Sequence, residues 1–400
     1  APPLRRAPLS APLWLNAHKR SQVSGFTPHP SRFRSQTSSL RFQHFSLSAF
    51  PFVPPVSAQT SCDRPKVSVA MITYNHEKFI AQAIESVLIQ ETSFPVELVI
   101  GEDCSTDGTR QVVRAFAQLH PNIIRPLLPE GNVGMHRNLQ SVLQACRGEY
   151  IAFLEGDDYW TSPQKLQKQA NFMDSHPDFS ICGHRMMHIF QDSAEGTPYP
   201  SPVQKEYGTL EDILRCNYLP TCSVVFRTSF LPEMPAWTRT LQHGDWPIWV
   251  LLAERGPVGF INEVWANYRV HSGGVWMGAS TEARLAGLKT TIKTIHKHLT
   301  KPHPAARRAA LFNMHLFGAS QFCRQGDYSQ VRTRLLLALV ISPVAFVRSG
   351  EVRALIGKQA RLYAIKKGLE PLKRRYYRAR IWAGAERRKM WQSAKALVGR

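Results

Sequence analysis

The fold is decided by the stretch from Tyr150 to Trp160, which reads YIAFLEGDDYW. Its beginning is apolar and predicts a buried strand, and Glu155, Asp157 and Asp158 follow directly. Carboxylates at the end of a buried strand repel one another and are poorly solvated, so a hard divalent cation stabilises them. The alternative is an acidic turn that caps a helix opened by Pro163.

Strand and helix patterns alternate upstream of this stretch. The apolar spacing predicts strands at 67–72, 96–100, 123–128 and 150–154, with helices between them at 80–88, 112–119 and 139–146. Such alternation predicts an α/β fold with a parallel sheet, whose ligands lie beyond the carboxyl ends of the strands. Polar clusters follow the first, second and fourth strands, so we expect all three clusters at that edge.

Three segments carry a family resemblance: Val69–Asn75, Glu102–Thr109 and Arg147–Trp160. In their order and spacing they resemble the family 2 glycosyltransferases with the GT-A fold, of the bacterial cell-surface polysaccharide type, over residues 66–275. The resemblance implies a Rossmann-like nucleotide-binding mixed sheet flanked by helices, with a C-terminal helical extension. It also implies transfer of a sugar from a nucleotide diphosphate donor (UDP-, dTDP- or GDP-linked), with inversion at the anomeric carbon.

The resemblance assigns a nucleotide site to four residues. Thr73 and Tyr74 are expected against the base, Asp103 accepts a hydrogen bond from it, and Arg137 reaches the base or ribose. A carboxylate can accept from a ring N–H, and an aromatic side chain offers a stacking face. The alternatives are a turn-forming role for Asp103 and a surface salt bridge for Arg137.

The pair Asp157-Asp158 resembles the DXD-type motif of the family. The resemblance implies that Asp157 contacts the ribose and that Asp158 binds Mg²⁺ or Mn²⁺, which bridges the diphosphate. Glu155 stands where an aspartate is frequent, and its part in metal binding is left open. The resemblance also brings His271 near the metal or the diphosphate, since imidazole can bind Mn²⁺; a purely structural histidine is the alternative.

The segment 242–250 resembles the part of the family that carries the catalytic base, and the resemblance implies that Asp245 is this base. An inverting transfer needs one carboxylate to take the proton from the attacking hydroxyl. Gly244 replaces an acid that is common in the family. The alternative is that Asp245 caps the following helix, and the two roles are compatible. Three tryptophans, Trp160, Trp246 and Trp265, could line a sugar pocket or belong to the core.

Composition divides the chain into three regions: 1–64, 65–280 and 281–400. The first contains one acidic residue, and we expect it to be a disordered or non-native extension. The second is the expected glycosyltransferase domain. The third is helical and basic: residues 351–400 hold fifteen Lys and Arg against three Glu, in a chain of net charge +21. This tail suits the surface of an anionic membrane, and a solvated basic helix is the alternative.

Two other functions compete with the glycosyltransferase. A non-catalytic basic protein that binds polyanions would gain nothing from carboxylates gathered at one sheet edge. A sugar-1-phosphate nucleotidyltransferase would need a Gly-rich basic loop after the first strand. We therefore expect an enzyme that acts on a cell-surface glycan or lipid-linked acceptor and binds no nucleic acid.

The odd number of cysteines, with no Cys-x-x-Cys pair, indicates a reducing compartment. We place the enzyme in the cytoplasm, peripherally at the inner face of the plasma membrane.

Overall fold

The computed structural model of the protein describes residues 64–190, 196–200, 204–271, 273–274, 276 and 278–358, and positions 378, 381 and 385. Its strands are β1 (Val67–Thr73), β2 (Val96–Glu102), β3 (Ile124–Leu127), β4 (Tyr150–Phe153), β5 (Tyr159–Trp160), β6 (Ile181–Phe190), β7 (Thr197–Tyr199), β8 (Tyr207–Gly208), β9 (Val225–Arg227) and β10 (Val258–Val270). Its helices are α1 (Ile80–Leu88), α2 (Thr109–Leu119), α3 (Met135–Ala145), α4 (Lys165–Ser175), α5 (Leu210–Arg215), α6 (Asp245–Ala253), α7 (Thr281–His298), α8 (Pro304–Gln325), α9 (Tyr328–Ile341), α10 (Pro343–Arg348) and α11 (Gly350–Lys358).

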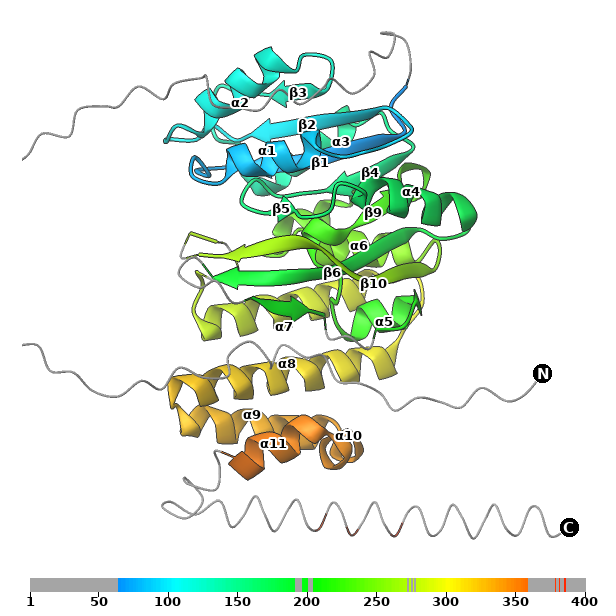
Figure 1. Ribbon diagram of the computed structural model, residues 1–400. Helices are drawn as coiled ribbons and strands as arrows, with labels where there is room; N and C mark the ends of the chain where they lie inside the picture. The colour runs from blue at the N-terminus through cyan, green and yellow to red at the C-terminus, as the bar shows by residue number, and fades with distance from the viewer. Residues whose placement is uncertain are drawn as a thin grey trace, which may run out of the picture. The chain divides into compact units, whose positions relative to one another are not determined.

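One mixed sheet runs through the molecule in the order β3-β2-β1-β4-β9-β6-β10-β5 (Figure 1). β1 is parallel to β2 and β4, and β2 is parallel to β3, as the alternating pattern predicts. Beyond β4 the sheet turns mixed, because β9 runs antiparallel to both β4 and β6. The expected α/β class with a mixed sheet flanked by helices is confirmed.

The sheet separates two hydrophobic cores, and alternate residues of a strand enter different cores. In β1, Val69 packs with α1 and α4, whereas Ala70 packs on the opposite face. In β2, Leu98 and Ile100 share the core of Val69, and Val99 shares that of Ala70. Because both faces are covered, these strands are mostly apolar, apart from residues such as Ser68 in β1 and Glu97 in β2, and this made them recognisable in the sequence.

The long strand β10 ties the acidic segment to the rest of the sheet. It pairs with β5 through Ala266 opposite Trp160 and Asn267 opposite Tyr159. It also runs parallel to β6, with irregularities in the register between Ile261 and Ala266. Neither β6 nor β9 shows a clear pattern in the sequence, and the sequence analysis did not predict them.

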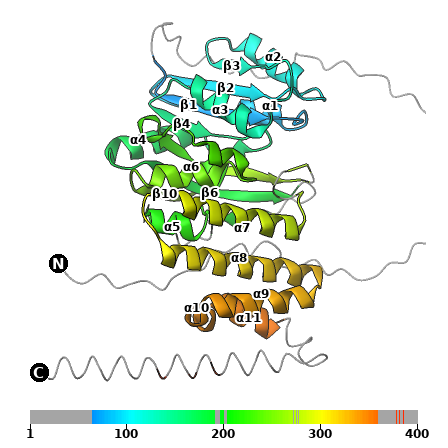
Figure 2. The ribbon, with the colours of Figure 1, turned by 180° about the vertical axis from the view of Figure 1, so that it is seen from behind.

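The helices from α7 onward follow the expected helical pattern. α8 contacts α5, α7 and α9, and α11 returns to α8. Figures 1 and 2 show α9, α10 and α11 on the side of α8 away from the sheet. The apolar run 335–347 forms the end of α9 and most of α10, separated at Ser342. Among the described residues, no helix has both the length and the apolar character needed to cross a membrane.

Two predicted regions lie largely outside the described residues. They are the N-terminal extension, apart from Arg64, and the part of the basic tail beyond residue 358, apart from positions 378, 381 and 385. The division of the chain at residue 280 stays a prediction.

Candidate active site

The carboxyl ends of β1, β2 and β4 bring the predicted polar clusters to one edge of the sheet. Thr73 ends β1, Asp103 follows β2, and the acidic residues follow β4. Asn75 and Cys104 adopt left-handed backbone conformations with φ of 57° at the turns after β1 and β2. Such conformations are uncommon outside glycine and gather at functional sites, which agrees with the expected position of the site.

Glu155, Asp157 and Asp158 form a compact acidic cluster, the acid triad. One carboxylate oxygen from each lies within 4.8 Å of the others. The turn is tight, since the Asp158 N–H donates to the Glu155 carbonyl at 3.1 Å. A side chain at Gly156 would approach Thr73 Oγ1 to 2.6 Å, so only glycine lets the turn pass this close to β1.

The electrostatics of the acid triad favour a cation. Burial, with the charges of Asp157 and Asp245, raises the pKa of Glu155 to about 8. Burial and its acidic neighbours also raise the pKa of Asp158 well above its ordinary value. The Oδ2 atom of Asp158 is buried and has no hydrogen-bond partner among the described residues. Clustered oxygens of this kind fit Mg²⁺ or Mn²⁺, which accept carboxylate ligands.

The end of β10 supplies basic partners to the triad. The Arg269 backbone N–H donates to Asp158 Oδ1 at 2.9 Å, and its guanidinium donates to the Asp157 carbonyl at 2.6 Å. His271 Nε2 lies 3.0 Å from Asp157 Oδ2, and His76 Nε2 lies 3.8 Å from the same atom. Burial raises the pKa of Asp157, but the His271 hydrogen bond and the charges of both histidines outweigh it, so the net direction is downward.

A cavity of about 500 Å³ opens beside the triad. Of the predicted site residues, those that line it are Thr73, Tyr74, Asp103, Asp157 and Asp245. Glu155 lines it as well, whereas Asp158 and His271 do not contribute to the lining. The sequence analysis gave the metal to Asp158 and His271 and left Glu155 open. In the structure, Glu155 and Asp157 face the cavity and Asp158 lies behind them.

Asp103 holds a loop at the cavity wall. Its two carboxylate oxygens accept from the backbone N–H groups of Val133 at 2.7 Å and Gly134 at 2.9 Å. Gly134 has φ of 84°, a conformation that favours glycine, and it begins α3. The turn-forming role considered for Asp103 is therefore present. A carboxylate has about four acceptor positions, so a further hydrogen bond to a ligand is compatible with it.

Arg137 lies on the exposed face of α3 and does not line the cavity. Its neighbour Asn138 does, and its amide donates to the Gly101 carbonyl at 2.8 Å. Among the described residues no ion pair to Arg137 is formed, so the surface salt bridge considered for it is not seen either. The assignment of Arg137 to the nucleotide stays a prediction.

Asp245 is the first residue of α6 and faces the cavity. Its Oδ1 accepts from the Trp246 N–H at 2.7 Å, as a residue at a helix start can. Its Oδ2 accepts from the Asn217 amide at 3.0 Å and from the Thr221 hydroxyl at 3.4 Å. The sequence analysis missed Asn217 and Thr221, because neither belongs to a motif and both precede Asp245 by more than twenty residues.

His243 and Trp276 also line the cavity and were missed. The ring of His243 lies 5.0 Å from that of Trp276, and its Nδ1 is 3.1 Å from the Thr291 hydroxyl on α7. Of the three tryptophans considered for a sugar pocket, Trp246 lines the cavity, whereas Trp160 and Trp265 are buried elsewhere. The tryptophans of the cavity wall therefore come from α6 and from the segment before α7, and further aromatic residues line the cavity at Tyr74, Phe153, Tyr199 and Tyr268.

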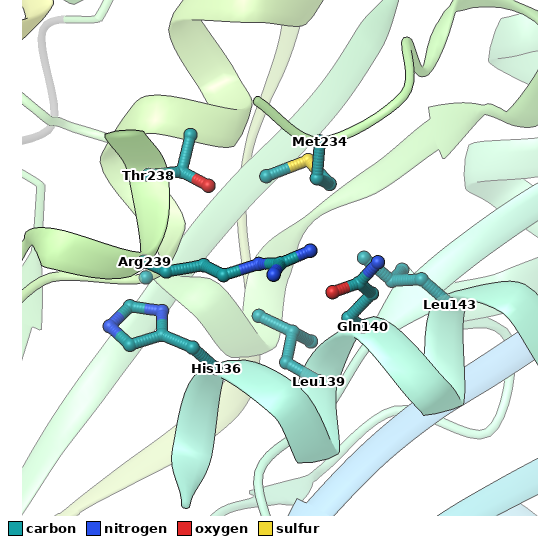
Figure 3. A pocket seen from close by; sticks show the side chains of 8 residues that line it. His136, Leu139, Gln140, Leu143, Met234, Thr238 and Arg239 are labelled. Carbon is teal, nitrogen blue, oxygen red and sulfur yellow. The ribbon is translucent and has the colours of Figure 1, made fainter. Parts of the chain in front are cut away.

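A second, small pocket lies beside α3 and shares Leu139 and Gly244 with the large cavity. Figure 3 shows the Arg239 side chain lying across it, near His136 and Gln140. Its volume of about 20 Å³ is enough for roughly one water molecule. The space for a substrate is therefore in the large cavity.

Comparisons with known proteins support the family resemblance. The glycosyl transferase family 2 model matches residues 68–231. An uncharacterised protein of Mycobacterium tuberculosis is 35% identical over 58% of this chain and 69% of its own length. The putative teichuronic acid biosynthesis glycosyltransferase TuaG of Bacillus subtilis is 33% identical over 52% of this chain and 80% of its own length.

A solved structure shows the same fold. It is the mannosyltransferase PcManGT from Pyrobaculum calidifontis in complex with GDP-Man and Mn²⁺. The match has a TM-score of 0.51 at 17% identity and covers 82% of this chain and 88% of the other. The motifs at the sheet edge and the sequence identity to TuaG over most of its length lead to one conclusion: the chain is an enzyme and belongs to family 2 of the glycosyltransferases.

Proposed function

We propose that the enzyme transfers a sugar, with inversion, from a nucleotide diphosphate to a cell-surface glycan or lipid-linked acceptor, with Mg²⁺ or Mn²⁺ as cofactor. One observation carries the proposal. Glu155 and Asp157 of the acid triad line the same cavity as Asp245, which comes from a distant part of the chain, and Asp158 belongs to the same cluster of carboxylates. This is the arrangement that a displacement needs, with a leaving-group side and a base side.

The leaving-group side is formed by the acid triad. We assign the metal to Asp158 together with the cavity-facing oxygens of Glu155 and Asp157. His271 lies beside Asp157. When bound, a divalent cation stabilises the charge that develops on the departing diphosphate. His271 orients Asp157 through its 3.0 Å contact, and the Arg269 N–H orients Asp158. The protein thus fixes the oxygens in place before the donor binds.

The base side is formed by Asp245. Asn217 and Thr221 donate to its Oδ2, which holds the carboxylate in one orientation. An ionised carboxylate can take the proton of an acceptor hydroxyl as the new bond forms on the face opposite the leaving group. Trp246 and Trp276 offer apolar faces against which a sugar ring can stack.

The nucleotide site is formed by the ends of β1 and β2. Thr73 and Tyr74 line the cavity there, and the Tyr74 ring is 42% exposed and free to stack on a base. Asp103 lies opposite, at the loop it holds. We keep Arg137 as a residue that approaches the base or ribose side, and Asn138 is the neighbouring residue that already lines the cavity.

The similarities support the acceptor class and the donor class. TuaG is named for teichuronic acid biosynthesis, and PcManGT was solved with GDP-Man and Mn²⁺. We propose by extension a UDP-, dTDP- or GDP-linked donor, action on an envelope polymer, and a place in the cytoplasm at the inner face of the plasma membrane. The acidic cavity argues against the polyanion-binding alternative, since its carboxylates would repel phosphate in the absence of a cation.

Binding of UDP, dTDP and GDP, measured by thermal shift with Mn²⁺ and with EDTA, tests the proposal. One nucleotide should stabilise the protein in the presence of Mn²⁺ only, by mass action. The corresponding sugar donors should then be hydrolysed or transferred by the wild type and by Glu263→Gln, a matched control that removes an exposed acid. If no nucleotide stabilises the protein in the presence of Mn²⁺, the proposed donor site is wrong.

A further inference from the structure

The C-terminal half of the outer face of α9 is apolar although it has no covering element among the described residues; in the first half, Ser329, Arg332 and Thr333 are exposed and polar. Val331, Leu335 and Ala338 form the buried side of this helix, which packs on α8. On the opposite side, Leu337 is 40% exposed and Val340 is 74% exposed. A helix of a globular protein usually places polar residues on its outer face, so this arrangement needs an explanation.

The apolar side chains continue onto α10. Val344 is 36% exposed and lies on α10, two residues after Ser342, which separates α9 from α10. Leu337, Val340 and Val344 together are called the α9–α10 face. They make up three of the nine large hydrophobic side chains that are exposed in the described part of the chain, and they are the only ones close together in sequence. Such a cluster marks an interaction surface.

Exposed cationic side chains lie close to the α9–α10 face in the sequence. Arg332 precedes it on α9, Arg348 ends α10, and Arg353 follows on α11, and all three are exposed. The one acidic residue between 328 and 358 is Glu351, whose Oε1 atom is buried. Residues 328–358 therefore combine exposed apolar side chains with positive charge and carry no exposed acid; the nearest exposed acid in the sequence is Asp327, which caps the start of α9.

We propose that the α9–α10 face rests on an anionic lipid bilayer, with the three valine and leucine side chains in the interface and the arginines at the phosphates. Charge complementarity decides among the candidate occupants. The rest of the chain, 359–400, holds thirteen Lys and Arg against two Glu and would be repelled by the arginines. A second copy would bring like charges together across a symmetric interface. Anionic lipid satisfies both the apolar and the cationic groups.

The inference deepens the proposed function, because a lipid-linked acceptor is presented at a bilayer. The test is co-sedimentation of the full chain with vesicles of phosphatidylcholine, alone or mixed with phosphatidylglycerol. The double substitution Leu337→Asn and Val340→Asn should weaken binding to the mixed vesicles by about tenfold. Leu119→Asn, on the 69% exposed Leu119 of α2, is the matched control and should bind as the wild type does.

Three further measurements make the result decisive. Mn²⁺-dependent nucleotide binding by the double variant should equal that of the wild type, which shows that it is folded. Asp245→Asn should bind vesicles normally, so a failure of the proposed catalysis leaves this test intact. The inference is overturned if the wild type does not sediment with the mixed vesicles, or if the double variant sediments with them as the wild type does. It is also overturned if sedimentation velocity shows that the substitutions abolish dimers while vesicle binding is unchanged.

Discussion

Replacing Glu155 by glutamine should stabilise the metal-free protein near neutral pH. The folded-state pKa of Glu155 is raised to about 8, against 4.5 for an ordinary glutamate, so the folded protein binds a proton that the unfolded chain has lost. The contribution of Glu155 to stability is fully present below pH 4.5 and declines as the pH rises toward 8. Glutamine has the shape of the protonated form and cannot ionise, so the decline should vanish.

The magnitude follows from the two pKa values. The two and a half pH units between 4.5 and 7, at about 1.36 kcal/mol per unit, amount to a penalty of about 3 kcal/mol at pH 7. In a chain of this size, a change of that magnitude moves the melting temperature by about 5 °C. In EDTA at pH 7 to 8, Glu155→Gln should therefore melt about 5 °C above the wild type, and at pH 4.5 the two should melt together.

The assay is thermal unfolding of both proteins across this pH range, in EDTA and in Mn²⁺. Mn²⁺ should stabilise the wild type more as the pH rises, since its ligands must be deprotonated, and should stabilise Glu155→Gln less. The exposed Glu263→Gln controls for the loss of one negative charge. Equal melting temperatures of wild type and Glu155→Gln at pH 8 in EDTA would refute the reasoning.

Three other substitutions test the remaining assignments. Asp245→Asn should keep nucleotide binding and lower the turnover number by about a hundredfold or more, and near-normal turnover would move the base elsewhere. Asp158→Asn keeps an oxygen that accepts from the Arg269 N–H but removes the negative charge. Titration calorimetry should therefore show no Mn²⁺-dependent nucleotide binding, whereas the melting temperature in EDTA should not fall. Lys165→Met should raise the melting temperature at pH 7 but not near pH 10. Burial lowers the pKa of Lys165 to about 7, so the wild type gains stability as the pH rises above 7. An equal increase in melting temperature at both pH values would contradict this.

The sequence predicted the parts of the site that depend on local order. β1, β2 and β4 are mostly apolar on both faces, and the carboxyl ends of parallel strands must share an edge, so Thr73, Asp103 and Asp157 could be brought together without a structure. The sequence did not predict which side of a helix faces the cavity. Arg137 and Asn138 differ by one position on α3, and only the second lines the cavity.

Long-range partners were equally beyond prediction. Asn217 and Thr221 reach Asp245 only because the segment before β9 folds back beside α6, and nothing in the local pattern encodes that return. The same applies to β6, whose neighbours β9 and β10 lie about forty to eighty residues further along the chain. Which carboxylates of the acid triad face the cavity also depends on this packing.

The pairing of β10 with β5 determines which changes in chain length the site can tolerate. Ala266 and Asn267 fix the position of β10 against the strand that follows the acid triad, and Arg269 and His271 reach Asp158 and Asp157 from there. One residue inserted or deleted between 267 and 271 would reverse the sides on which these groups project. The irregular stretch 261–266 can absorb an extra residue as a further bulge. Relatives of this enzyme should therefore vary in length before residue 266 and keep a constant spacing after it.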